Sequence, residues 1–198
     1  MPSRGMTHSV NLCPMYLHNR ETLLFVDETG TDRKDAIRKY GYSLRGKPLK
    51  AQKLLVRGEH ISCIAAISMQ GIVALKIARG SVDGDTFYNF VCTSLLTKLM
   101  PFNGTNQNSV LILDNCSVHH VHEVGQALSD CGVITHYLPP YSPDYNPIEL
   151  AFSKVKYVIK SMEAEMQAIN DLETIVLAAF ATITPVDCQH WINSIGIY

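Results

Sequence analysis

The sequence predicts an α/β protein with a mixed five-stranded sheet and helices on both faces. Its 198 residues, 46% of them hydrophobic, suffice for one globular domain with a real core. The first apolar runs follow one another as a β-meander, and the later ones alternate between helical and strand patterns. A meander followed by such alternation is typical of a mixed sheet covered by helices.

The first half of the chain contains four runs with the residue composition of strands. Thr22–Asp27 is a short apolar run that fits a buried strand closed by an acid, and the stretch to Leu49 is polar, basic and loop-like. The β-rich runs that follow are separated by short polar breaks, with a hairpin turn expected at Gln70-Gly71. They cover Leu54–Val56, Ile61–Ser68 and Ile72–Ile77.

The second half predicts alternating helices and strands. Asp83–Met100 has apolar residues at helical spacing, and Pro101 ends that pattern. Val110–Leu113 is wholly apolar and ends in Asp114, as expected for a central strand covered on both faces. A helix, a strand, a Pro/Tyr-rich loop and a further helix come next, before two more helical stretches. The first four are placed at Val121–Cys131, Val133–Leu138, Pro139–Asn146 and Pro147–Met162.

Charge is distributed unevenly along the chain. Nine of the 17 Lys and Arg residues fall between Arg33 and Arg57 with a single acid among them, a local charge of +8. The rest of the chain carries −9. Such asymmetry indicates a nucleic-acid-facing segment, and an ordinary solvated basic loop is the alternative.

Three acids stand out by position. Asp27 and Asp114 end two predicted strands, and Glu149 lies in the first turn of the helix after the Pro-rich loop. Carboxyl ends of neighbouring strands meet at one edge of an open α/β sheet, so these side chains are expected to cluster there. Clustered carboxylates need a counter-charge, which hard divalent ions such as Mg²⁺ or Mn²⁺ supply.

Each acid also has a purely structural interpretation. Asp27 could cap a turn, Asp114 could form an Asx turn with Asn115, and Glu149 could complete a capping box begun by Asn146. Glu28 is expected to point to the opposite face of its strand from Asp27 and is therefore not counted with the three acids.

Four sequence blocks carry a family resemblance. FVDETG (25–30), GYSLRGKP (41–48), LILDNCSVHH (111–120) and LPPYSPDYNPIELAFSKVK (138–156) occur in this order, with 34 residues between Asp114 and Glu149. Together they resemble the catalytic domain of mariner-like (Tc-type) DDE transposases. The last block is the most specific, because a Pro-Pro-Tyr-Ser-Pro loop leading into Asn-Pro-x-Glu seldom arises by chance.

The resemblance implies a ribonuclease-H-like (retroviral-integrase-like) fold. It makes Asp27, Asp114 and Glu149 the catalytic acids and the ligands of two Mg²⁺ or Mn²⁺ ions. The implied reaction is cleavage of a DNA strand at transposon ends by activated water. Strand transfer follows, in which the freed 3′-hydroxyl attacks target DNA.

Other residues are candidates for supporting roles. Basic residues of the loop and of the helix after Glu149 are candidates for contacts with DNA phosphates: Arg45, Lys47, Lys50, Lys156 and Lys160. Polar residues beside the acids are candidates for holding the ligands or touching substrate: Asn115, His119, His120 and Asn146. Asp83 and Asp85 are interpreted as the N-cap and a first-turn acid of the following helix and not as metal ligands. The six scattered cysteines are interpreted as small buried hydrophobes in a reducing compartment.

The expected organisation is residues 1–20 as a disordered remnant before a catalytic domain at 21–198. Transposases of this kind carry an N-terminal helix-turn-helix reader, and only about 20 residues precede the first strand here. Partners expected from the resemblance are DNA and, because two ends must be joined, a second copy of the chain. No membrane partner is expected, and the location is the nucleus in a eukaryote or otherwise the cytoplasm, without secretion. A catalytically idle, domesticated DNA-binding or protein-interaction domain is the alternative, and a nuclease for RNA–DNA hybrids a weaker one.

Overall fold

A computed structural model describes residues 17–32, 45–47, 60–140, 142–162 and 171–195. Its centre is a five-stranded sheet in the order β3-β2-β1-β4-β5. The strands are β1 (Leu23–Asp32), β2 (His60–Ser68), β3 (Gly71–Arg79), β4 (Val110–Leu113) and β5 (Ile134–Tyr137). β1, β2 and β3 are antiparallel, while β4 and β5 run parallel to β1, so the sheet is mixed as predicted.

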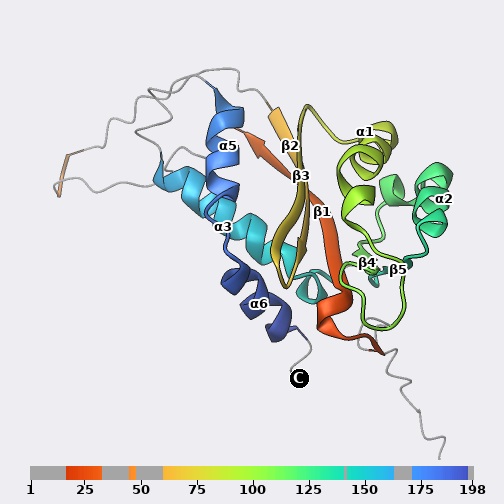
Figure 1. Ribbon diagram of the computed structural model, residues 1–198. Helices are drawn as coiled ribbons and strands as arrows, with labels where there is room; N and C mark the ends of the chain where they lie inside the picture. The colour runs from red at the N-terminus through yellow and green to blue at the C-terminus, as the bar shows by residue number, and fades with distance from the viewer. Residues whose placement is uncertain (1–16, 33–44, 48–59, 141, 163–170, 196–198) are drawn as a thin grey trace, which may run out of the picture.

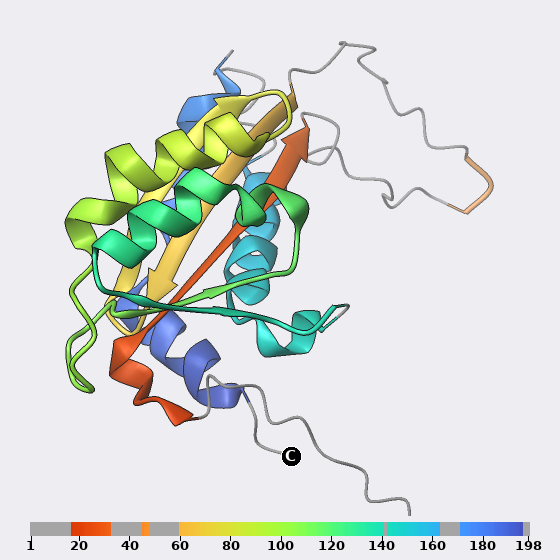
Figure 2. The ribbon, with the colours of Figure 1, turned by 90° about the vertical axis from the view of Figure 1, so that its right-hand side faces the viewer.

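Helices cover both faces of this sheet (Figures 1 and 2). One face carries α3 (Ile148–Ser161), α5 (Leu172–Phe180) and α6 (Pro185–Ser194). The other carries α1 (Gly84–Phe90), with its continuation to Lys98, and α2 (His122–Asp130). Short 3-10 turns occupy Arg20–Thr22, Ser117–His120 and Pro143–Tyr145.

Alternation along β1 builds both layers of the core. Leu23 and Phe25 belong to the cluster under α3, α5 and α6, whereas Leu24 and Val26 belong to the cluster under α1 and α2. Because successive side chains of a strand point to opposite faces, a run of four apolar residues is what a strand covered on both sides requires.

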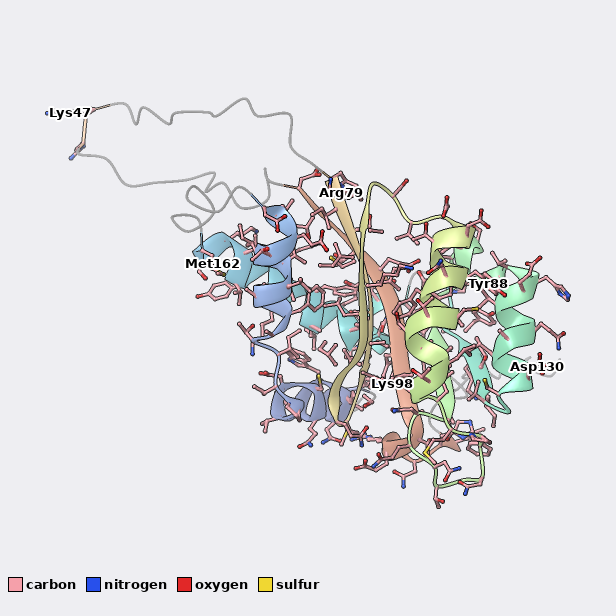
Figure 3. All side chains as sticks on the ribbon, turned by 45° about the horizontal axis from the view of Figure 1, so that its top comes forward. Lys47, Arg79, Tyr88, Lys98, Asp130 and Met162 are labelled. Carbon is pink, nitrogen blue, oxygen red and sulfur yellow. The ribbon has the colours of Figure 1, made fainter. Side chains whose placement is uncertain are left out.

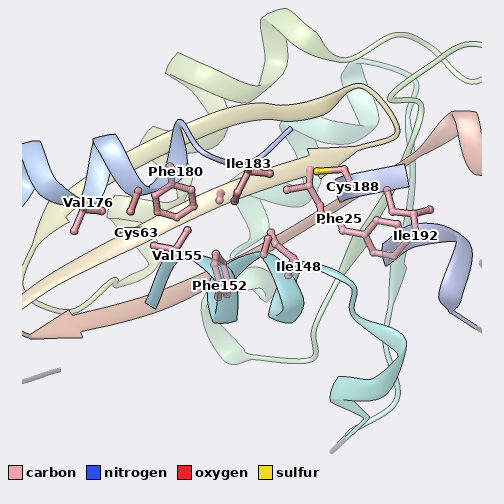
Figure 4. Packing of buried hydrophobic residues seen from close by; sticks show 14 of the residues in the cluster. Phe25, Cys63, Ile148, Phe152, Val155, Val176, Phe180, Ile183, Cys188 and Ile192 are labelled. Atoms are coloured by element: carbon pink, nitrogen blue, oxygen red, sulfur yellow. The ribbon is translucent and has the colours of Figure 1, made fainter. Parts of the chain in front are cut away.

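The apolar stripe of α3 packs as the sequence predicts. Phe152 and Val155 are at most 2% exposed, and the ring of Phe152 meets that of Phe180 on α5 edge-on at 6.4 Å between centroids. Figure 4 shows these side chains between the helices and the sheet. This packing fixes α3 on the sheet, and with it the position of Glu149 in the first turn of the helix.

Several element boundaries differ from the sequence prediction. β1 does not end at Asp27 but continues to Asp32, because its pairing with β2 holds residues 25–32 extended. The helix predicted at 83–100 changes after Phe90 to a π-turn at Val91–Leu95 and a 3-10 turn at Leu96–Lys98. The predicted strand at 54–56 lies outside the described residues, as does most of the basic loop.

Two smaller predictions are confirmed. Asp83 caps α1, its side chain accepting a hydrogen bond from the Thr86 backbone at 2.9 Å. The β2–β3 hairpin turns at Met69 and Gln70, and Gly71 has a φ of 111°, a conformation that glycine adopts without strain.

Among the described residues, no single helix is long and apolar enough to cross a membrane; α5 and α6 pass the length and composition test only as a pair bent by 70°.

Candidate active site

Sheet register brings two of the predicted acids side by side. Val26 of β1 pairs with Leu113, the last residue of β4, so the next residues along the two parallel strands are Asp27 and Asp114. β4 ends there while β1 continues, which leaves both carboxyl groups at the edge where β4 stops. Asp27 therefore reaches the predicted position from the middle of a strand and not from its end.

A cavity of about 460 Å³ opens at this edge of the sheet. All three predicted acids line it, together with residues that follow β4, the Pro-rich loop after β5 and the start of α3. Its lining is Asp27, Asp114, Asn115, Cys116, Leu138, Pro139, Pro140, Ser142, Pro143, Asn146 and Glu149. Asp27, Asp114 and Glu149, widely separated in sequence, are thus brought to one site.

Asp27 is the most buried of the three acids, at 8% exposure. Its Oδ1 accepts a hydrogen bond from the Glu28 backbone, and its Oδ2 accepts one from Asn146 Nδ2, each at 2.7 Å. Burial, followed by repulsion from Asp114, Glu28 and Glu149, raises the pKa of Asp27 to about 8. Asp27 is therefore largely protonated at neutral pH, because its buried surroundings disfavour the charged form.

Asn146 supports Asp27 and does not cap the helix. Its side chain makes no capping bond to α3, which begins after Pro147, so the capping-box interpretation is wrong. With Nδ2 donating to Asp27, Asn146 Oδ1 is buried and has no hydrogen-bond partner among the described residues. A buried acceptor without a partner is costly, and Asn146 is one of the residues that line the cavity.

Asp114 is held by different neighbours. Its Oδ1 lies 2.7 Å from His119 Nδ1 and accepts a hydrogen bond from the Cys116 backbone at 2.9 Å. The hydrogen bond with His119 lowers the pKa of Asp114 below its usual value, in spite of partial burial. The two neighbouring acids are therefore shifted in opposite directions.

His119 is fully buried and bridges two carboxylates. Its Nε2 lies 2.9 Å from Glu28 Oε2, while its Nδ1 faces Asp114. Burial opposes charging of the ring, but the hydrogen bonds with Asp114 and Glu28 outweigh it and raise the pKa of His119 to about 10. Glu28 does point away from Asp27, as expected, but sequence reasoning missed its link to the site; the adjacent DE pair was the one signal for it.

The remaining polar candidates, Asn115 and His120, contact each other. His120 Nε2 is 2.7 Å from Asn115 Oδ1, and the His120 ring stacks on Tyr137 at 4.3 Å between centroids. Asn115 itself lines the cavity. Cys116 also lines it and is exposed, so the interpretation of every cysteine as a buried hydrophobe is wrong. All five cysteines in the described part of the chain are free thiols.

The candidate DNA-binding residues lie outside the cavity. Lys156 is half-buried and Lys160 exposed, at seven and eleven residues after Glu149 on the continuous helix α3. Arg45 and Lys47 are exposed, and Figure 3 places Lys47 well away from the sheet. Lys50 lies outside the described residues.

The three acids do not form a ready-made cage. Within the described ranges, no three His, Cys, Asp or Glu side chains are arranged to hold one metal ion together. The three acids nevertheless offer only oxygen donors to the cavity, and repulsion among them contributes to the raised pKa of Asp27. These residues fit a hard divalent cation better than a soft one.

A model of the DDE superfamily endonuclease family matches residues 22–173. The chain belongs to this family. The matched range runs from β1 past α3 and so contains all three acids of the cavity. No curated protein sequence matches the chain.

Solved structures show the same ribonuclease-H-like fold. The Mos1 mariner paired-end complex with Mn superimposes with a TM-score of 0.69 at 16% identity, covering 87% of this chain and 52% of that one. The Mos1 catalytic domain with raltegravir and Mg gives 0.62 at 13% identity, covering 89% and 79%. A simian T-cell lymphotropic virus intasome gives 0.58 at 10% identity, covering 87% and 56%. The chain spans about half the length of the chain in the Mos1 paired-end complexes.

Proposed function

We propose that this chain is the catalytic domain of a DNA transposase. It cleaves a DNA strand with water and then joins the freed 3′-hydroxyl to a phosphodiester of target DNA, which releases the target's own 3′-oxygen, with two Mg²⁺ or Mn²⁺ ions as cofactors. The observation that carries the proposal is the convergence of Asp27, Asp114 and Glu149 on one cavity within a DDE-family fold. Mos1 structures with Mg and with Mn support a divalent cofactor.

The cavity's oxygen atoms would hold the ions. Asp27, Asp114 and Glu149 supply carboxylates, and Asn146 Oδ1 adds an unpaired neutral oxygen beside Asp27. When bound, such ions supply positive charge for the attacking and leaving oxygens of an in-line phosphoryl displacement. Asp27 must release its proton for this, because its pKa of about 8 keeps it largely protonated at neutral pH.

The chain's own residues then orient the acids. Asn146 Nδ2 fixes Asp27 Oδ2, and the Cys116 backbone together with His119 fixes Asp114 Oδ1. Glu149 is exposed at the first turn of α3, so it can approach a substrate without leaving its helix. Residues of the Pro-rich loop also line the cavity: Leu138, Pro139, Pro140, Ser142 and Pro143.

DNA would continue from the cavity along α3. Lys156 and Lys160 lie about 10 Å and about 16 Å beyond Glu149 along the helix axis, on the side of Glu149. Mos1 structures with a transposon end support a DNA partner. The proposal also includes DNA contacts from Arg45, Lys47 and Lys50. It includes a homodimer that joins two DNA ends, and nuclear location in a eukaryote.

The test is divalent-dependent nicking of supercoiled plasmid by the full chain, wild type beside Glu149→Gln. We expect Glu149→Gln to lose on the order of 10³-fold in rate, because a ligand that stabilises the transition state is removed from an exposed position. Its thermal unfolding should stay unchanged for the same reason.

Glu123→Gln is the matched control. Glu123 is also an exposed first-turn acid, but on α2 and outside the cavity, so its replacement should leave nicking unaffected. Equal nicking by wild type and Glu149→Gln would refute the proposal. So would the absence of nicking by a folded wild-type chain that also fails to bind Mn²⁺.

A further inference from the structure

A buried histidine joins Asp114, which lines the cavity, to Glu28, whose side chain lies on the opposite face of β1 from Asp27. His119 contacts Glu28 of β1 through Nε2 and Asp114, just after β4, through Nδ1, at 2.9 and 2.7 Å. Carboxylate oxygens only accept hydrogen bonds, so both contacts are hydrogen bonds only if both ring nitrogens carry hydrogen. The geometry thus places a cationic ring between two anions.

The ring is also held from its other sides. It packs against Phe87 of α1 with centroids 4.5 Å apart. The His119 backbone donates to the Cys116 carbonyl at 3.1 Å and accepts a hydrogen bond from the Tyr137 hydroxyl at 3.2 Å. With no exposed surface and three elements around it, the imidazole has one orientation available.

Fixing His119 fixes the carboxyl group of Asp114. Two donors, His119 Nδ1 and the Cys116 backbone, bind Oδ1, which leaves Oδ2 for a ligand in the cavity. Without the ring, Asp114 would keep only the Cys116 backbone bond and would be less firmly oriented, because its side chain is 43% exposed. Partners that orient a metal-binding carboxylate affect metal affinity strongly although they never touch the ion.

We propose that Glu28 is a positioning residue for the active site, acting through His119 to hold Asp114 with one oxygen directed to a divalent ion. This inference rests on the proposed function. β1 then serves the site twice: Asp27 lines the cavity directly, and Glu28, on the opposite face, acts through the imidazole. The rival explanation is that Glu28 acts only as a nearby negative charge, since it also repels Asp27.

A double-mutant cycle separates the two explanations. Mn²⁺ affinity is measured by calorimetry on the full chain for wild type, Glu28→Gln, His119→Gln and the double variant, each checked for folding by circular dichroism. We expect each single change to weaken Mn²⁺ binding about 10- to 100-fold. The double variant should be no weaker than His119→Gln alone, because Glu28 has nothing left to act through.

A second replacement of the histidine sharpens the test. An Asn side chain places its amide nitrogen near the position of Nδ1, and a Gln places it near Nε2. His119→Asn should therefore keep part of the bond to Asp114 and bind Mn²⁺ more tightly than His119→Gln. In nicking assays Glu28→Gln should lower kcat and leave KM for plasmid unchanged, which a loss of stability alone would not do.

Three results would overturn the inference. If Glu28→Gln binds Mn²⁺ as tightly as the wild type, Glu28 has no positioning role. If the effects of the two single changes add up in the double variant, Glu28 acts only as a nearby negative charge. A folded wild-type chain that binds no Mn²⁺ refutes the proposed function and this inference together. If the wild type binds Mn²⁺ and Glu28→Gln binds it with the same affinity, the inference is refuted and the proposed function is not.

Discussion

Replacing Asp27 by Asn is expected to stabilise the metal-free protein while abolishing its activity. Burial and the neighbouring carboxylates raise the pKa of Asp27 from 3.8 to about 8. Between those values the unfolded chain is ionised at this residue while the native protein retains the proton. The native state binds more protons, so the free energy of unfolding falls as pH rises, by about 1.4 kcal/mol per pH unit.

The pKa interval sets the size of the effect. Over four pH units, the loss in the free energy of unfolding has an upper limit on the order of 5 kcal/mol, reached at pH 8 and above. Below about pH 4 there is no loss, because Asp27 is protonated in both states. An Asn side chain carries no charge but remains polar, so a gain on the order of 2 kcal/mol, or about 4–8 °C in Tm, is expected at pH 8. The new amide can accept from the Glu28 backbone and donate to the unpaired Asn146 Oδ1 after that carboxamide turns over.

The assay is urea unfolding in EDTA at pH 5 and pH 8, followed by circular dichroism. The stability gain of Asp27→Asn over wild type should be larger at pH 8. Asp114→Asn is the matched control with the opposite sign. It replaces a carboxylate whose pKa is lowered by His119 with a neutral amide beside that buried cation, and should destabilise the protein at both pH values. A gain for Asp27→Asn that does not grow with pH would refute the reasoning.

Three further changes test the metal, the DNA surface and the core. Mn²⁺ affinity should rise about tenfold between pH 6.5 and 7.5, since Asp27 must lose a proton on binding; equal calorimetric Kd values would contradict this. The double change Lys156→Ala and Lys160→Ala should weaken DNA binding, measured by fluorescence anisotropy, and should reduce the slope of log K against log salt by about one per lysine. Lys98→Ala, on the other face of the sheet, should change neither. Phe152→Ala should lower the free energy of unfolding by about 3–5 kcal/mol in denaturant titrations, because the ring is 2% exposed; a loss below 1 kcal/mol would mean that α3 is not packed as described.

The sequence predicted the fold because its apolar residues repeat with the period of each element. Leu23–Val26 and Val110–Leu113 could be read as central strands from their unbroken apolar runs, and α3 from its stripe at helical spacing. These patterns are local, so they can be recognised without knowledge of the tertiary structure. Boundaries were less well predicted: β1 runs five residues past Asp27 because β2 pairs with it, and that pairing is a long-range contact.

The same division applies to the candidate site. Asp27, Asp114 and Glu149 could be named from their positions at strand ends and at a helix start, and from the motifs around them. Their pKa values could not be predicted from the sequence, because a pKa depends on burial and on neighbours distant in the chain. Two adjacent aspartates have opposite pKa shifts only because Asp27 is buried beside Asn146 while Asp114 meets His119.

What the sequence alone determined is the order of strands and helices, the family resemblance and the choice of three candidate acids. What only the tertiary structure decided is how they are held: the turn of Asn146 away from its helix end toward Asp27, and the bridge from Glu28 through His119 to Asp114. Both connect residues about 90 to 120 positions apart. Local pattern carries no information on such contacts, since they form only when the sheet register brings β1 beside β4 and the helices pack on its two faces.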